Sequence, residues 1–127
     1  MLPVPAPRWT VDHLASRALT RLRAKGPAPV SGDVTAVFEL ELDAAGVVTS
    51  ARYRCSRSCV TLLALCEAAA LMVEGRPISE AATTDSGALL ERVPGIPPSK
   101  AGRAVIASAA LTSAARHHTR NERMLHP

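Results

Sequence analysis

The sequence predicts an α+β fold, in which a small antiparallel sheet packs against helices. Residues 33–55 have the pattern of a β-hairpin, and segments of helical periodicity lie on both sides of it. Of the 127 residues, 47% are hydrophobic, which is enough for one core and not for two. Because a hairpin alone is marginally stable, helices must cover one of its faces, with a third strand as an option. We therefore expect a single domain over residues 1–127.

The first helix is predicted over residues 10–24. An irregular lead-in with three prolines, residues 1–8, precedes it. Thr10 is a suitable N-cap, and Gly26 followed by Pro27 ends the helical pattern. The apolar stripe at helical spacing consists of Val11, Leu14, Ala15, Ala18 and Leu22.

The hairpin is predicted from alternation of apolar and polar residues. In the first strand, residues 33–42, one face holds Val34, Ala36, Phe38, Leu40 and Leu42. Residues 43–46, Asp-Ala-Ala-Gly, form the loop, with Gly46 where a positive φ is needed. In the second strand, residues 47–55, the same period places on one face Val47, Thr49, Ala51, Tyr53 and Cys55.

A second helix is predicted over residues 59–74. The residues that share one face at helical spacing are Cys59, Leu62, Leu63, Cys66, Ala70 and Val73. Gly75 is expected just past the end of this helix. Short helices follow over residues 78–84 and 85–93, and Asp85 or Ser86 is the expected N-cap of the second.

An alanine-rich helix over residues 99–118 closes the ordered part of the predicted fold. Its core-facing residues are expected to be Ala101, Ala104, Val105, Ser108, Leu111, Thr112 and Ala115. Residues 119–127 are polar and are expected to form a frayed tail. His117 and His118 would complement the helix dipole near this C-terminus, and His13 and His126 are weaker candidates for any site.

Composition and charge restrict the functional class. The chain has one Trp, one Tyr and one Phe, so the stacking platforms of single-strand nucleic-acid binders are missing. The net charge of +4 is segregated, with basic ends and an acidic middle, as in solvated helix faces or a surface for an acidic protein partner. No run of about 18 apolar residues and no signal-peptide layout occurs. We therefore expect a cytoplasmic protein that binds neither nucleic acid nor membrane.

All three cysteines lie where the strand pattern changes to the helix pattern. Three cysteines are too few for a disulfide framework, so they are expected to be free thiols, metal ligands or reactive groups. Cys59 falls in the first turn of its helix, where unpaired N–H groups and the dipole stabilise a thiolate. Three nearby arginines are expected to act in the same direction: Arg52, Arg54 and Arg57.

The other two cysteines have different expected roles. Cys66 lies seven residues after Cys59, about 10 Å along the helix, so the two thiolates cannot bind one iron. Cys66 is expected to be a small buried core residue. Cys55 is within reach of Cys59 across the junction, as a second ligand, a resolving thiol or an inert residue.

Several short motifs occur in a characteristic order. Residues 29–34 read Pro-Val-Ser-Gly-Asp-Val, residues 43–46 Asp-Ala-Ala-Gly, residues 51–54 Ala-Arg-Tyr-Arg, residues 74–78 Glu-Gly-Arg-Pro-Ile and residues 96–100 Ile-Pro-Pro-Ser-Lys. Their order and spacing resemble the iron–sulfur cluster assembly scaffolds of the IscU and NifU N-terminal type. The resemblance extends from residue 29 to about residue 115 and implies a SufE/NifU-like fold.

The resemblance also implies a ligand set, from which this chain departs. Scaffolds of this type bind a cluster through three cysteines and an aspartate, since iron–sulfur clusters prefer thiolates. Two of these positions are retained, as Cys59 and Asp33, whereas the other two are occupied by Ser31 and Arg103, which are not expected to bind. The expected ligands of iron or a [2Fe–2S] cluster are therefore Cys59, Asp33 and Cys55.

The implied function is that of a scaffold, not an enzyme, which holds iron or a cluster on Cys59 and Asp33 and delivers it to targets. One alternative is a SufE-like sulfur acceptor that carries a persulfide on Cys59, received from a cysteine desulfurase. Another alternative is a non-catalytic adaptor in the same process. The implied partners are a cysteine desulfurase, and assembly chaperones or target apoproteins.

Overall fold

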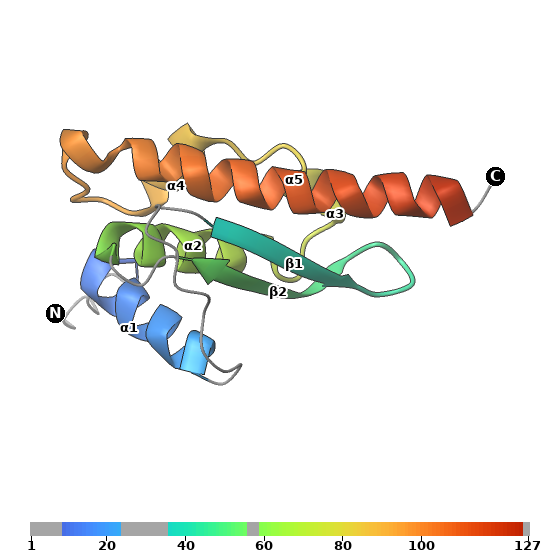
Figure 1. Cartoon of the computed structure of the whole chain (residues 1–127), viewed down its shortest axis with the longest axis horizontal. Helices are drawn as coiled ribbons and strands as arrows, with labels where there is room; N and C mark the ends of the chain where they lie inside the picture. Colours follow the sequence, from blue (N-terminus) through green and yellow to red (C-terminus); the bar gives the residue numbers. More distant parts are fainter. Residues whose placement is uncertain (1–8, 24–35, 56–58, 126–127) are drawn as a thin grey trace, which may run out of the picture.

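The computed structural model describes residues 9–23, 36–55 and 59–125, and it confirms the α+β fold (Figure 1). The elements are α1 (Val11–Arg23), β1 (Ala36–Leu42), β2 (Val48–Cys55), α2 (Val60–Val73), α3 (Ile78–Ala81), α4 (Ser86–Arg92), the 3₁₀ helix η1 (Pro98–Lys100) and α5 (Gly102–Leu125). No helix in these ranges combines the length and apolarity that spanning a bilayer requires. The expected lead-in, residues 1–8, lies outside the described residues.

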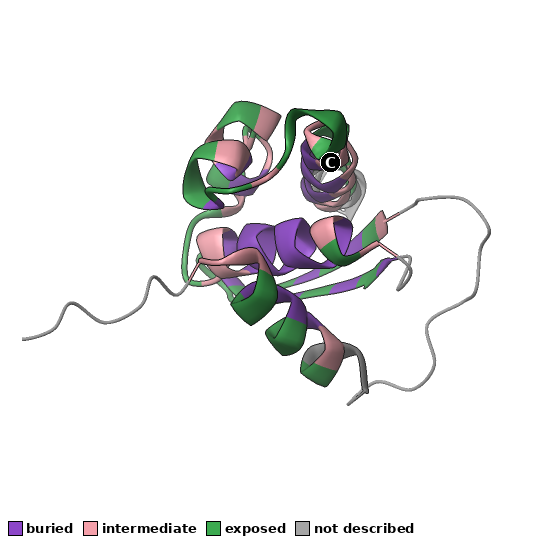
Figure 2. Ribbon diagram, turned by 90° about the vertical axis from the view of Figure 1, so that its left-hand side faces the viewer, coloured by how far each residue is buried: buried purple, intermediate pink, exposed green. Residues whose placement is uncertain are grey.

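Helix α2 is the centre of the molecule. It packs against α1, β2 and α5, and Figure 2 shows the middle of its ribbon in the colour of buried residues. Every residue from 62 to 70 is buried, including Glu67, although the sequence predicts one apolar face. A helix that is apolar around its whole circumference belongs in the interior, and α2 takes that position because other elements surround it.

The hairpin confirms the expected alternation in β1. Phe38 pairs with Tyr53 and Leu40 with Ala51 in an antiparallel register, and these four side chains are buried. The side chain of Val37 is 56% exposed, on the opposite face. The predicted start of the first strand, residues 33–35, lies outside the described residues.

The inward face predicted for the start of β2 is wrong. Val48 is fully buried and Thr49 is exposed, whereas the period predicts Thr49 inside. The register shifts between Glu41 and Leu42, so that Leu42 pairs with Val48. An irregularity of one residue moves the following side chains to the other face, and simple alternation cannot anticipate it.

The loop between the strands has the predicted form. The Asp43 carboxylate accepts hydrogen bonds from the N–H groups of Ala45, at 2.9 Å, and Val47, at 3.0 Å. Gly46 has a φ of 80°. Within the described residues the optional third strand is absent, and Val47 makes only an isolated bridge with Pro77.

Helix α5 runs along the hairpin and covers β1 (Figure 1). It continues to Leu125, beyond residue 118 where the sequence predicts its end. Its buried stripe consists of Ala104, Ala107, Ser108, Leu111 and Ala115. Val105, predicted to face the core, is 56% exposed, because it lies one residue off this stripe.

The other helix ends follow local rules. The Thr10 side chain accepts a hydrogen bond from the N–H of His13 at 3.3 Å, as expected of an N-cap. The Asp85 side chain likewise accepts from the N–H of Ala88 at 2.7 Å. Gly75, with a φ of 83°, directly follows Glu74, the C-cap of α2, as predicted.

Candidate functional site

Cys59 lies at the junction of β2 and α2, immediately before the first turn of α2, whereas the sequence places it within that turn. It is the N-cap of α2, with extended backbone dihedrals, and its carbonyl accepts the N–H of Leu63 at 3.0 Å. Its side chain makes no capping hydrogen bond within the described residues. The thiol is partly exposed and lies at the positive end of the helix dipole, a position that favours thiolate chemistry.

The other two thiols are buried. Cys66 is fully buried in the middle of α2, which confirms the predicted core position, and Cys55 is 4% exposed at the end of β2. The Cys66 thiol is hydrogen-bonded to Cys55. Of the chain's three cysteines, Cys59 alone is partly exposed, and it packs against the edge of the core.

The Cys66 thiol is held in its protonated form. The hydrogen bond to Cys55 raises the pKa of Cys66 well above its ordinary value of 9.0. Burial raises this pKa further, as do the charges of Cys55, Glu67 and Cys59. Cys66 therefore keeps its proton near neutral pH and is a poor nucleophile.

The arginines expected to assist Cys59 have other partners. Arg52 pairs with Glu41 at 2.9 Å, and Arg54 pairs with Glu39 at 3.3 Å, on the exposed face of the hairpin. Arg57 lies outside the described residues. These ion pairs join the two strands of the hairpin, and the predicted influence of Arg52 and Arg54 on the Cys59 thiol stays a prediction.

The positions taken from the resemblance are described only in part. Asp33 and Ser31 lie outside the described residues. Arg103 lies in the first turn of α5, and its buried Nε has no hydrogen-bond partner in the described part of the chain. No group of three His, Cys, Asp or Glu side chains within residues 9–23, 36–55 and 59–125 is arranged to hold a metal ion.

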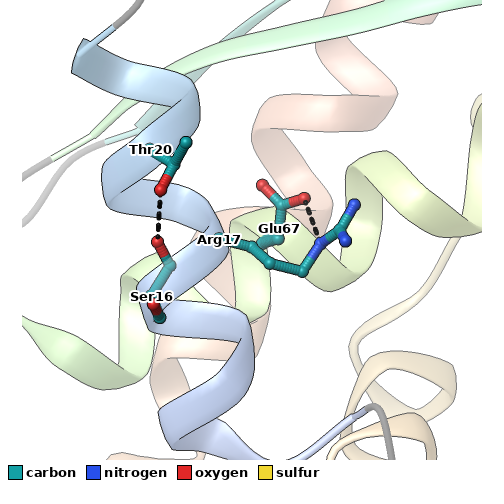
Figure 3. A pocket seen from close by; sticks show the side chains of 4 residues that line it. All are labelled: Ser16, Arg17, Thr20 and Glu67. Carbon is teal, nitrogen blue, oxygen red and sulfur yellow. Dashed lines mark hydrogen bonds and ion pairs between the residues drawn. The ribbon is translucent and has the colours of Figure 1, made fainter.

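The structure reveals a buried carboxylate that the sequence reasoning missed. Glu67 of α2 is 1% exposed, and it accepts a hydrogen bond from the Tyr53 hydroxyl at 2.6 Å. Arg17 of α1 forms an ion pair with Glu67 at 3.5 Å (Figure 3). The available signal was a lone Glu inside the apolar run of α2, since a buried charge requires partners.

Glu67 also lines a cavity of about 350 Å³ between α1 and α2, together with Ser16, Arg17 and Thr20 (Figure 3). The Thr20 hydroxyl donates to the Ser16 carbonyl at 3.2 Å. Because Tyr53 and Arg17 engage the two carboxylate oxygens of Glu67, this network joins α1, α2 and β2. The contacts within this network are structural, and the charge of Glu67 also acts on the neighbouring Cys66.

The adjacent histidines His117 and His118 both lie where α5 meets β1. The His118 Nε2 lies 2.7 Å from the Leu40 carbonyl, which ties α5 to β1. His117 lines a cavity of about 340 Å³ between the same two elements. Since α5 continues past both residues, they are not at the helix terminus where the sequence places them. His13 lines a third cavity, beside Trp9, and His126 lies outside the described residues.

Comparisons with known proteins support the resemblance. The family model described as "NifU-like N terminal domain" matches residues 14–124. A search of curated proteins finds no match. The matched range includes α1 to α5 almost entirely, together with the thiol junction.

Proposed function

The chain belongs to the family of NifU-like N-terminal domains, whose role is in iron–sulfur cluster assembly, and from this premise we propose that Cys59 is the group that handles its cargo. One observation carries the proposal: Cys59 is partly exposed at a helix N-terminus, whereas Cys55 and Cys66 are buried. The protein would act as a carrier within the assembly machinery and not as an enzyme.

The cargo that this geometry favours is sulfane sulfur. A single exposed thiolate suffices for persulfide transfer, in which the Cys59 thiolate attacks the outer sulfur of a persulfide on a cysteine desulfurase. A bond then forms between Cys59 and that sulfur, and the desulfurase cysteine leaves as a thiolate. This corresponds to the SufE-like alternative.

Direct binding of iron or a [2Fe–2S] cluster as cargo is the second candidate. It would use Cys59 with Asp33 and Cys55, because carboxylate and thiolate are suitable iron ligands. Cys55 and Cys66 are buried, so Cys59 is the partly exposed cysteine of the chain. Such a site needs further ligands, from Asp33 or from a second subunit.

Two anaerobic experiments on the full chain separate these candidates. In the first, the protein is incubated with a cysteine desulfurase and cysteine, and intact-mass spectrometry is expected to show one added sulfur atom on Cys59. In the second, the protein is mixed with iron and sulfide, and absorption spectra and bound iron are measured. Cys59→Ser should abolish the added sulfur, whereas the buried control Cys66→Ala should retain it.

The outcomes assign the function. Added sulfur without bound iron supports the sulfur acceptor, and bound iron with cluster absorption supports the scaffold. If neither occurs, and Cys59→Ser supports cluster assembly as well as the parent protein does, the protein is an adaptor and the proposed role of Cys59 is wrong.

A further inference from the structure

The outer edge of β2 is closed by hydrogen bonds. The N–H of Val48 donates to the Arg76 carbonyl at 2.9 Å, and the Val48 carbonyl accepts from the N–H of Gly75 at 2.7 Å. The Ala51 N–H donates to the Glu74 carboxylate at 3.4 Å. An unpaired strand edge is a template for another chain, and the segment that follows α2 covers this one.

Among the described residues, the outer edge of β1 is open at its start. In an antiparallel pair, every second residue directs its N–H and C=O groups away from the partner strand. Ala51 does so, and so does Leu40 opposite it, whose carbonyl lies 2.7 Å from the His118 Nε2 of α5. The same period turns the backbone groups of Ala36 and Phe38 towards the free edge, where they have no hydrogen-bond partner in the described part of the chain.

A groove lies beside this open edge, and we refer to it as the β1–α5 groove. Helix α5 runs along β1 (Figure 1), and the cavity of about 340 Å³ between them lies next to Ala36, Val37 and Phe38. The small side chains of its α5 wall are those of Ala110, Ser113 and Ala114. Neighbouring strands lie about 4.8 Å apart, whereas a helix is about 10–12 Å across, so the groove suits an extended segment and not a helix.

The outward face of β1 indicates the charge of that segment. Val37, Glu39 and Glu41 lie on this face with exposed side chains. The arginines that pair with the two carboxylates lie on β2, on the side away from the open edge. A strand added at the open edge therefore has Val37 and Glu39 as its neighbours on this face, and cross-strand pairs of opposite charge are stabilising.

We propose that the β1–α5 groove binds an extended, basic segment of a partner protein, which adds a third strand to the sheet. The backbone of the segment forms hydrogen bonds with the outward N–H and C=O groups of Ala36 and Phe38, the mode by which peptides add to open sheet edges. Its inward side chains are small and apolar and face the α5 wall. Its outward side chains place an apolar group beside Val37 and a basic group beside Glu39. The inference goes beyond the proposed function, because the groove does not include Cys59.

The test uses the full chain and a blocked peptide, acetyl-Gly-Lys-Ala-Val-Ala-Lys-Gly-amide, which has the required pattern in both chain directions. NMR titration gives its Kd, and amide hydrogen exchange is measured with and without it. In the free protein, the Phe38 amide is expected to exchange faster than the Val37 amide, which faces β2. With the peptide at about ten times its Kd, exchange of the Phe38 amide should slow about tenfold, and that of Val37 should not change.

Matched controls separate strand addition from unspecific attraction. The same peptide, N-methylated at its three central residues, keeps its charge but loses backbone donors, and should bind roughly tenfold more weakly. Ala114→Leu fills the groove and should abolish binding, whereas Ala109→Leu, at an exposed position of α5, should not. Glu39→Gln should weaken binding roughly two- to fivefold, and Glu91→Gln on α4 should leave it unchanged. Thermal melts establish that each variant is folded, and the N-methylated peptide tests the parent protein without any variant.

Several outcomes would overturn the inference. One is the absence of any effect on the Phe38 amide up to the solubility limit of the peptide, and another is equal binding of the N-methylated peptide. If the Phe38 amide of the free protein is as protected as that of Val37, the edge is already occupied. Protection that rises with protein concentration then identifies a second copy as the occupant, and protection independent of concentration identifies the chain itself; both contradict the docking of a partner.

Discussion

Removal of the Tyr53 hydroxyl should destabilise the fold through the buried Glu67. The hydroxyl donates to the Glu67 carboxylate at 2.6 Å, and the two residues are 4% and 1% exposed. Tyr53→Phe removes this donor and keeps the ring, which packs 5.3 Å from the ring of Phe38. Arg17 cannot compensate well, because it is half-exposed and its ion pair spans 3.5 Å.

The expected loss follows from these contacts. A hydrogen bond to a charged group stabilises a protein by about 1.5–3 kcal/mol, and burial places this one within that range. We therefore expect Tyr53→Phe to lower the free energy of unfolding by about 2 kcal/mol. For a chain of this size, the melting temperature should fall by roughly 6–10 °C.

Urea denaturation followed by circular dichroism measures this loss, with equal m-values as the requirement for comparison. Arg17→Met is the matched control on the same carboxylate, and its cost should stay below about 1 kcal/mol. A double-mutant cycle of Tyr53→Phe with Glu67→Gln should show a coupling energy above about 0.5 kcal/mol. A Tyr53→Phe variant as stable as the parent, or additive effects in the cycle, would refute the reasoning.

Three further predictions concern the thiols and one glycine. The pKa of Cys66 is raised in the folded protein, so above about pH 9 the unfolded chain loses this proton first. The free energy of unfolding therefore falls as the pH rises. Urea titrations from pH 8 to 10.5 should show a steeper fall for the parent protein than for Cys66→Ala. Iodoacetamide should label Cys59 in the native protein, whereas Cys55 and Cys66 should react only on unfolding; equal labelling of all three, read by mass spectrometry, contradicts the burial. Gly75→Ala should lower the free energy of unfolding by about 1 kcal/mol because its φ is +83°, although the added Cβ would meet no atom within 4 Å. Gly102→Ala has the same open space but lies in a helix, so it should be neutral or stabilising. Losses of equal size in thermal melts would mean that φ is not the cause.

Local features of the fold were predictable because the residues that determine them are close in sequence. Thr10 and Asp85 cap helices through their own side chains, and Asp43 with Gly46 forms the hairpin loop. Alternation in β1 identified its buried face. Each of these patterns depends on contacts over a few residues, which composition and spacing describe directly.

Features that depend on three-dimensional surroundings were not predictable in the same way. The register shift at Leu42 depends on how β1 pairs with β2, and it reverses the orientation expected for Thr49. Val105 is apolar and lies near the predicted stripe, but the contacts of α5 leave it exposed. Glu67 is buried because Arg17 and Tyr53, far from it in sequence, supply partners.

Cys59 is partly exposed and Cys66 is buried, a difference that the helical periodicity in the sequence does not explain. Both lie on one predicted helical face, but all faces of α2 are buried, so position along the helix decides exposure and periodicity does not. Cys59 is accessible because it precedes the first turn. A cargo that needs several thiolates must therefore recruit ligands from elsewhere, whereas a persulfide needs Cys59 alone.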